Sequence, residues 1–190
     1  MARTLVIVPR MYTKSEFKET ISHIPDDYDA KYEEFWTYVI DKLRIFRGHI
    51  RKVFLESLSR DSLESLRIVC GDDERGYSLI VELLGEGAEL EPTEDPILVT
   101  ETESWLKMIK STSYDALLEL YEENLAERNQ YVSNLIVRSL EEGEVGLIIM
   151  DSRRKLELPQ DYRIIKVCPF DPADYINSEI IKARLKSGRT

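Results

Sequence analysis

Four acidic residues lie at or just after the ends of short apolar segments that have the composition of buried strands. They are Glu56, Glu94, Asp95 and Asp151. Ligands of open α/β sheets bind in the crevice at the carboxyl ends of the strands, so residues placed there are the first candidates for function. These carboxylates are the most informative feature of the sequence.

Carboxylates from separate strands can support two kinds of chemistry. They can converge as oxygen ligands of Mg²⁺ or Mn²⁺, and for this role we select Glu56, Asp95 and Asp151. They can also divide into a general acid and a general base when their surroundings separate their pKa values, and for this role we select Glu56, Glu94 and Asp95. The alternative for each residue is structural: it caps the following helix or pairs with an arginine.

Several cations fall near the same strand ends or face them from a helix. Arg10 follows the first apolar run and Arg153 follows Asp151, so either guanidinium is a candidate to hold an anionic substrate. Arg128 lies in the middle of an apolar stripe on the longest expected helix, where a charge must find a buried partner or reach solvent along its own stem. A strand-end carboxylate would serve as that partner, and Arg128 would then orient it for catalysis.

Several familiar catalytic motifs are absent from the sequence. It contains no HExxH, GxSxG or GxxxxGK[ST] pattern and no glycine-rich dinucleotide loop after a strand. His23 and His49 are too few for a histidine zinc site, and neither lies at an expected strand end. Cys70 and Cys168 are far apart and lack CxxC spacing, which indicates reduced, buried thiols.

The elements that must position these residues follow from the spacing of apolar side chains. Continuous apolar runs predict buried strands, and apolar residues at i, i+3, i+4 and i+7 predict helices that pack through one face. The expected strands are Thr4–Val8, Lys52–Leu55, Ala88–Pro92, Val145–Met150 and Arg163–Val167. The expected helices are Ser15–Ser22, Tyr32–Ile50, Ser62–Val69, Tyr77–Leu84, Pro96–Ile109, Tyr114–Glu142 and Ala173–Leu185.

The alternation of strands and helices predicts an α/β fold. We expect a mostly parallel central sheet of about five strands, flanked by helices on both faces. Only residues 151–162 separate the last two strands, which permits either an irregular crossover or an antiparallel edge. The 190 residues fit a single domain, expected over residues 1–186, with a disordered tail at 187–190.

The composition limits the classes of partner. A net charge of −10, with basic residues interspersed among acidic ones, argues against nucleic-acid binding. No stretch has the ~18 apolar residues that a membrane span needs, so we expect no membrane association and a cytoplasmic protein. Trp36, Trp105 and ten tyrosines offer apolar surface for a homodimer, although core packing explains them equally well.

Three segments follow one another in a recognisable order. They are the strand Val53-Phe54-Leu55-Glu56, a late helix with Glu127-Arg128-Asn129, and the strand Val145–Met150. This order resembles the superfamily that contains TraB-like proteins, ChaN-like proteins and erythromycin esterases. The resemblance implies functional counterparts for Glu56 and Arg128, and it makes Asn129 a candidate substrate-binding residue.

The sequence departs from that superfamily at two motifs. The family carries GxxH motifs after its first strand and its late strand, and their histidines are thought to act in hydrolysis or metal binding. The matching stretches here read Val8-Pro9-Arg10-Met11 and Asp151-Ser152-Arg153-Arg154, without a histidine in either.

Two hypotheses about function follow. The first is a hydrolase that depends on its carboxylates and a metal, and acts on a small polar or anionic substrate. The second is a non-catalytic domain, a degenerate member of the superfamily, that binds a small-molecule ligand or another protein.

Overall fold

The computed structural model describes residues 2–14, 24–70, 75–111 and 115–187. The helix expected over Ser15–Ser22 and the last three residues of the expected tail lie outside this described part. No helix within the described ranges is long and apolar enough to cross a membrane.

The centre of the molecule is a parallel sheet with the strand order β3-β2-β4-β1-β5. Every pair of neighbouring strands is parallel, including β1 with β5, so the α/β prediction is confirmed. Of the two alternatives for the last strands, the structure has the irregular crossover, which passes from β4 over β1 to β5. The strands are β1 (Arg3–Pro9), β2 (Ile50–Leu55), β3 (Glu89–Pro92), β4 (Val145–Met150) and β5 (Tyr162–Lys166).

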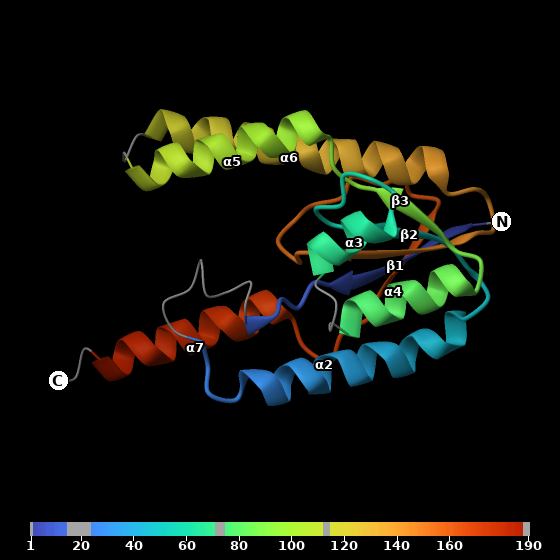
Figure 1. Cartoon of the computed structure of the whole chain (residues 1–190), viewed down its shortest axis with the longest axis horizontal. Coiled ribbons are helices and arrows are strands. Elements are labelled where there is room, and N and C mark those ends of the chain that lie inside the picture. Colours follow the sequence, from blue (N-terminus) through green and yellow to red (C-terminus); the bar gives the residue numbers. More distant parts are fainter. Residues whose placement is uncertain (1, 15–23, 71–74, 112–114, 188–190) are drawn as a thin grey trace.

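Helices occupy both faces of the sheet, as expected (Figure 1). They are α2 (Tyr28–Leu43), α3 (Leu63–Cys70), α4 (Arg75–Gly85), α5 (Pro96–Ser111), α6 (Asp115–Ser139) and α7 (Pro172–Ser187). The helix predicted to continue through Ile50 instead ends at Leu43 and is followed by a short 3-10 turn, Arg44–Phe46. Gly48 then adopts a φ of +70°, which turns the chain so that Ile50 becomes the buried first residue of β2.

Alternate residues of the central strands build two separate cores, because successive side chains of a strand point to opposite faces. On one face, side chains such as Val6, Val53 and Leu147 pack with α2, α3, α4 and α7. On the other face, Leu5, Phe54 and Ile148 pack with side chains of the C-terminal half of α6. Figure 1 shows α6 running along that face of the sheet. The strands are therefore covered on both sides and present their ends, rather than their faces, to ligands.

The connections between strands use both faces of the sheet. The segments after β1 and β2 cross the face of α2, α3 and α4, whereas those after β3 and β4 cross the face of α6. Leu156 and Leu158 of the β4–β5 crossover pack into the core on the α6 side. The neighbouring pairs β3–β2, β2–β4 and β4–β1 thus send their chains to opposite faces, the arrangement that opens a crevice at the carboxyl ends of a parallel sheet.

Gly146 of β4 lies close to the side chain of Phe54 on the neighbouring strand β2 and to that of Leu140, which follows α6. A Cβ atom at this residue would lie 3.2 Å from Phe54 Cε2 and 3.3 Å from both methyl groups of Leu140, which are themselves buried. We expect Gly146→Val to lower the free energy of unfolding by about 1–3 kcal/mol through overpacking, measured by denaturant unfolding. Gly85→Val is the control, because nothing lies within 4 Å of a Cβ at Gly85. Equal stability of the two variants would contradict this packing.

Candidate functional site

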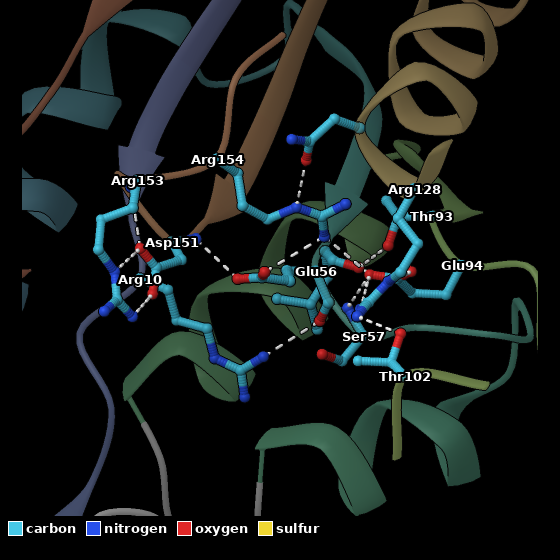
Figure 2. A network of polar contacts seen from close by, with 12 residues as sticks. Arg10, Glu56, Ser57, Thr93, Glu94, Thr102, Arg128, Asp151, Arg153 and Arg154 are labelled. Atoms are coloured by element: carbon cyan, nitrogen blue, oxygen red, sulfur yellow. Dashed lines mark hydrogen bonds and ion pairs between the residues drawn. The ribbon is translucent and has the colours of Figure 1, made fainter. Parts of the chain in front are cut away.

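Charged side chains from four strand ends and from α6 meet at the carboxyl edge of the sheet (Figure 2). We refer to them as the arginine–carboxylate network. Its members are Arg10, Glu56, Glu94, Arg128, Asp151, Arg153 and Arg154. Figure 2 shows Arg154 reaching between Glu56 and Glu94, with Asp151 and Arg153 to one side.

Glu94 is the most deeply buried carboxylate of the network, with 1% of its side chain exposed. Arg128 binds it in a bidentate manner, through Nε to Oε2 at 2.9 Å and through Nη2 to Oε1 at 2.8 Å. Arg154 Nη1 donates to the same Oε1 at 2.8 Å. The sequence left open whether Arg128 would pair with a strand-end carboxylate or reach solvent, and the structure pairs it with Glu94.

Arg154 joins the two glutamates. Its Nη1 atom lies 3.2 Å from Glu56 Oε1 as well as 2.8 Å from Glu94 Oε1, and its Nε donates to Asn129 Oδ1 at 2.8 Å. Its Nη2 atom is buried and has no hydrogen-bond partner among the described residues. A buried donor without an acceptor is costly, so an acceptor that reached this atom would be bound favourably.

The backbone near Glu56 is shaped to support the network. Glu56 Oε2 accepts a hydrogen bond of 2.6 Å from the backbone N–H of Asp151, which ties the ends of β2 and β4 together. Ser57 has a φ of +69°, which is uncommon for a residue other than glycine. The N–H of Ser57 donates to Glu94 Oε1 at 3.3 Å. Strained residues of this kind cluster at ligand sites, where the surrounding structure holds them in place.

Asp151 and Arg153 form the outer part of the network. Arg153 donates to Asp151 through Nε at 2.9 Å and through Nη2 at 2.5 Å, while 71% of its side chain remains exposed. Burial alone would raise the pKa of Asp151, but the hydrogen bonds and charge of Arg153 more than offset this and lower it. Arg153 therefore lies next to the end of β4, and its guanidinium is partly engaged in hydrogen bonds to Asp151.

Arg10 links the end of β2 to α3 through hydrogen bonds. Its Nη1 donates to the backbone carbonyl of Glu56 at 3.1 Å, and its Nη2 donates to that of Val69 at 2.8 Å. The guanidinium also stacks over the ring of Tyr12, 4.9 Å from its centroid. These contacts hold α3 against the end of β2, so Arg10 has a structural position within the network.

Asp95 does not join the network. Its Oδ1 accepts a hydrogen bond of 2.8 Å from the backbone N–H of Ile97, which caps the start of α5. This is the structural alternative for a strand-end acid. Its neighbour Thr93 is buried and donates to the carbonyl of Leu55, which fixes the chain that leads into Glu94.

The three residues selected as metal ligands are not gathered into one cluster in the part of the chain that the structure describes. The described residues contain no group of three or more His, Cys, Asp or Glu that could hold a metal ion. The physical reason is that Asp95 caps a helix, while the oxygens of Glu56 and Asp151 already face arginines and backbone N–H groups. Guanidinium groups thus contact the carboxylate oxygens that a metal cation would need as ligands, and they neutralise the carboxylate charge.

A polar chain continues from the network into the pair of helices α5 and α6. Arg128 Nη1 donates to Thr102 Oγ1 at 3.2 Å, and Thr102 in turn donates to the side chain of Asn124. Asn124 Nδ2 lies 3.2 Å from Glu101 Oε2. Thr102 and Asn124 are both buried, so the two helices are joined by hydrogen bonds as well as apolar contacts.

A cavity of about 340 Å³ lies beside the network, under the β4–β5 crossover. Its volume is at the lower end of the range of small-molecule sites. Apolar side chains such as Ile7, Leu156 and Leu158 form most of its wall. Its polar lining residues are Asp151, Ser152, Arg154 and Lys166.

Several site residues were not selected from the sequence. Arg153 was chosen as the substrate-binding arginine after β4, whereas Arg154 is the one at the centre of the network. The N–H of Arg154 donates to the Asp151 carbonyl at 3.1 Å, and this turn directs Arg154 inward and leaves Arg153 exposed. Nothing in the sequence distinguishes two adjacent arginines in a turn. Thr102 and Asn124 were detectable only as polar residues within helices.

The chain matches no known protein-family model, no curated protein and no solved structure. The resemblance to the TraB-like, ChaN-like and erythromycin-esterase superfamily therefore stays a prediction.

Glu94 is the residue whose charge the network depends on most. We expect Glu94→Gln to lower the free energy of unfolding by about 3 kcal/mol, because Arg128 and Arg154 would remain buried without their shared counter-charge. Denaturant unfolding of both proteins measures the difference. Glu34→Gln, which removes an exposed ion pair with Lys31, serves as the control and should change little. A Glu94→Gln variant as stable as the control would contradict the structural role of the network.

The network also predicts how stability depends on pH. Burial would raise the pKa of Glu94, but Arg128 and Arg154 more than offset it, so the folded-state pKa lies below the ordinary value of 4.5. A pKa lowered by folding adds stability that is complete above the ordinary value and is lost as pH falls through the folded value. We expect the free energy of unfolding to fall below about pH 4.5, and to fall less steeply in Glu94→Gln. Parallel pH slopes for the two proteins would show that Glu94 is not responsible.

Proposed function

We propose that this protein is a non-catalytic α/β domain that binds a small anionic ligand at the carboxyl edge of its sheet. The observation that carries the proposal is that each strand-end carboxylate selected from the sequence is already held by arginines, backbone N–H groups or a helix cap. A site of this kind is built to stay charged and fixed, not to transfer protons.

The carboxylates are poorly suited to general base catalysis. An efficient general base has a pKa near the working pH, and enzymes raise carboxylate pKa values by burial to reach it. Here the arginines act in the opposite direction and lower the pKa of both Glu94 and Asp151. The hydrolase hypothesis therefore has less support than the binding hypothesis.

The charge of the network favours an anion. Its four arginines exceed its three carboxylates by one, within a chain whose net charge is −10. The buried Nη2 of Arg154 lacks an acceptor among the described residues, and 71% of the Arg153 side chain is exposed at the outer part of the network. A carboxylate or phosphate group is the chemistry that complements these donors.

The neighbouring cavity favours a ligand that also has an apolar part. Its wall is mainly aliphatic, and Arg154 and Lys166 are the cations in its lining. A short aliphatic chain with a terminal carboxylate matches both properties. Such a ligand would place its chain against Leu156 and Leu158 and its charge toward the arginines.

Metal dependence separates the two hypotheses. We expect millimolar Mg²⁺ or Mn²⁺ to leave the thermal unfolding midpoint unchanged relative to NaCl of equal ionic strength, because no cluster of carboxylates in the described residues is available for a cation. Thermal denaturation followed by circular dichroism measures this. A rise in the midpoint that Glu56→Ala abolished would instead support the metal-dependent hydrolase.

A probe ligand tests the binding site directly. We expect hexanoate to cause saturable amide shifts at residues 150–158 in heteronuclear NMR spectra. Acetate should bind more weakly because it lacks the aliphatic chain, and hexanol because it lacks the carboxylate. Leu158→Trp should block the cavity and remove the shifts. Ile97→Trp is the matched control, because Ile97 is 69% exposed and lies outside the cavity lining. Shifts that survive Leu158→Trp, or that hexanol reproduces, would contradict the proposed ligand class.

A further inference from the structure

One edge of the central sheet is formed by β5, which pairs with β1 and with no other strand in the part of the chain that the structure describes. The N–H of Val167, directly after β5, donates to the Ile7 carbonyl at 2.9 Å, so this residue faces β1. Successive residues of a strand direct their backbone groups to opposite edges, so those of Ile164 and Lys166 face away from β1. Each of these two residues offers an N–H donor and a C=O acceptor to an added strand.

A groove of about 590 Å³ lies along the same strand, on the face of the sheet that α2 covers. Ile165 and Val167 line it from the strand side and belong to the core on that face. Tyr38, Ile45 and Phe46 line it from the end of α2 and the turn that follows. Ile45 is 75% exposed and Tyr38 is 38% exposed, so the strand edge is bordered by apolar surface that a partner can cover.

The groove also carries two cations, Lys42 and Arg163. Both are exposed, and within the described ranges neither forms an ion pair with a carboxylate. The ammonium group of Lys42 lies over the ring of Tyr38, 5.4 Å from its centroid. Lys166 adds no charge here, because its side chain points to the opposite face from Arg163 and pairs with Asp171 at 2.9 Å. No carboxylate is among the described lining residues, so the groove is locally basic in a chain whose net charge is −10.

These cations determine which chain can pair with the edge. Charges at sheet edges commonly prevent association between edges. They have that effect on a second copy of the same edge, because a symmetric contact brings Lys42 and Arg163 toward their own counterparts. The β3 edge of another copy does not complement them either, because Lys52 already holds the carboxylates of Glu89 and Glu91. An acidic segment of a different protein compensates both cations and is therefore the occupant that the charges select.

We propose that β5 is the docking site for an extended, acidic segment of a partner protein, which adds to the sheet as a further strand. The segment pairs with the outward-facing backbone groups of Ile164 and Lys166, and its side chains on the α2 face enter the groove. Alternate residues of a strand share a face, so the segment carries a carboxylate near Arg163 and an apolar side chain two positions away, against Tyr38 and Ile45. The backbone groups supply affinity, and the groove supplies the preference for acidic and apolar residues.

Selection from a library of random dodecapeptides displayed on phage tests the proposal with the full chain as the target. We expect the enriched peptides to carry acidic and apolar residues at alternate positions. Fluorescence anisotropy of a labelled synthetic copy of the most enriched peptide gives its Kd, which should rise as salt is added. Arg163→Glu should raise this Kd about tenfold or more, because it replaces attraction by repulsion. Arg60→Glu is the matched control, since Arg60 is exposed and lies outside the groove lining.

Backbone pairing has its own test. Ile164→Pro removes an outward-facing N–H but no hydrogen bond to β1, so it should raise the Kd about tenfold or more while circular dichroism shows a folded chain. Two copies of the peptide, N-methylated at odd or at even positions, leave the protein unchanged. Only one of them should lose binding, because alternate N–H groups of a strand point toward its neighbour. Hexanoate should not displace the peptide, because the cavity under the β4–β5 crossover lies on the α6 face.

Four results would overturn the proposal. The first is a selection that enriches no peptide, or only peptides without carboxylates. The second is binding to Arg163→Glu as tight as to the Arg60→Glu control. The third is equal binding of the two N-methylated peptides, which would show that the segment does not pair as a strand. The fourth is displacement by hexanoate, which would place the peptide in the cavity on the other face. Arg163 does not belong to the arginine–carboxylate network, so its substitution tests the β5 edge alone.

Discussion

The arrangement at the carboxyl edge depends on one buried interaction, the pairing of Glu94 with Arg128 and Arg154. The three residues come from the end of β3, the middle of α6 and the turn after β4. Each would be costly to bury alone, because a charge loses its hydration in the protein interior. Together they satisfy one another, so the ends of two strands and the covering helix are held in a single geometry.

A buried ion pair of this kind is weak evidence that the fold needs it for stability. Well-packed apolar side chains can replace such pairs at little or no cost, while loss of a single partner is severe. The network also carries costs that an apolar core would avoid: a positive φ at Ser57 and a buried Arg154 Nη2 without an acceptor among the described residues. Strain and an open donor at the carboxyl edge of a parallel sheet do not add stability, and they support the ligand binding that we propose.

Most of the fold could be predicted from the sequence because it depends on local patterns. Buried strands such as Val145–Met150 appear as continuous apolar runs, and their order among helices indicates a parallel sheet. The network was less accessible. Arg128 was recognisable as a charge in an apolar stripe, but its choice of Glu94 over Glu56 depends on how α6 lies across the strand ends. The roles of Asp95 and Arg154 depend on single turns, where one residue caps a helix and the other points inward.

The charge distribution of the whole molecule connects these local features. A net charge of −10 repels anions over most of the surface, and a region where arginines outnumber carboxylates is the exception on which the proposed anion site rests. At the carboxyl edge the carboxylates serve to hold arginines in place rather than to react. The carboxylates that first suggest catalysis therefore form part of a fixed, charge-compensated arrangement, and the lowered pKa values of Glu94 and Asp151 follow from it.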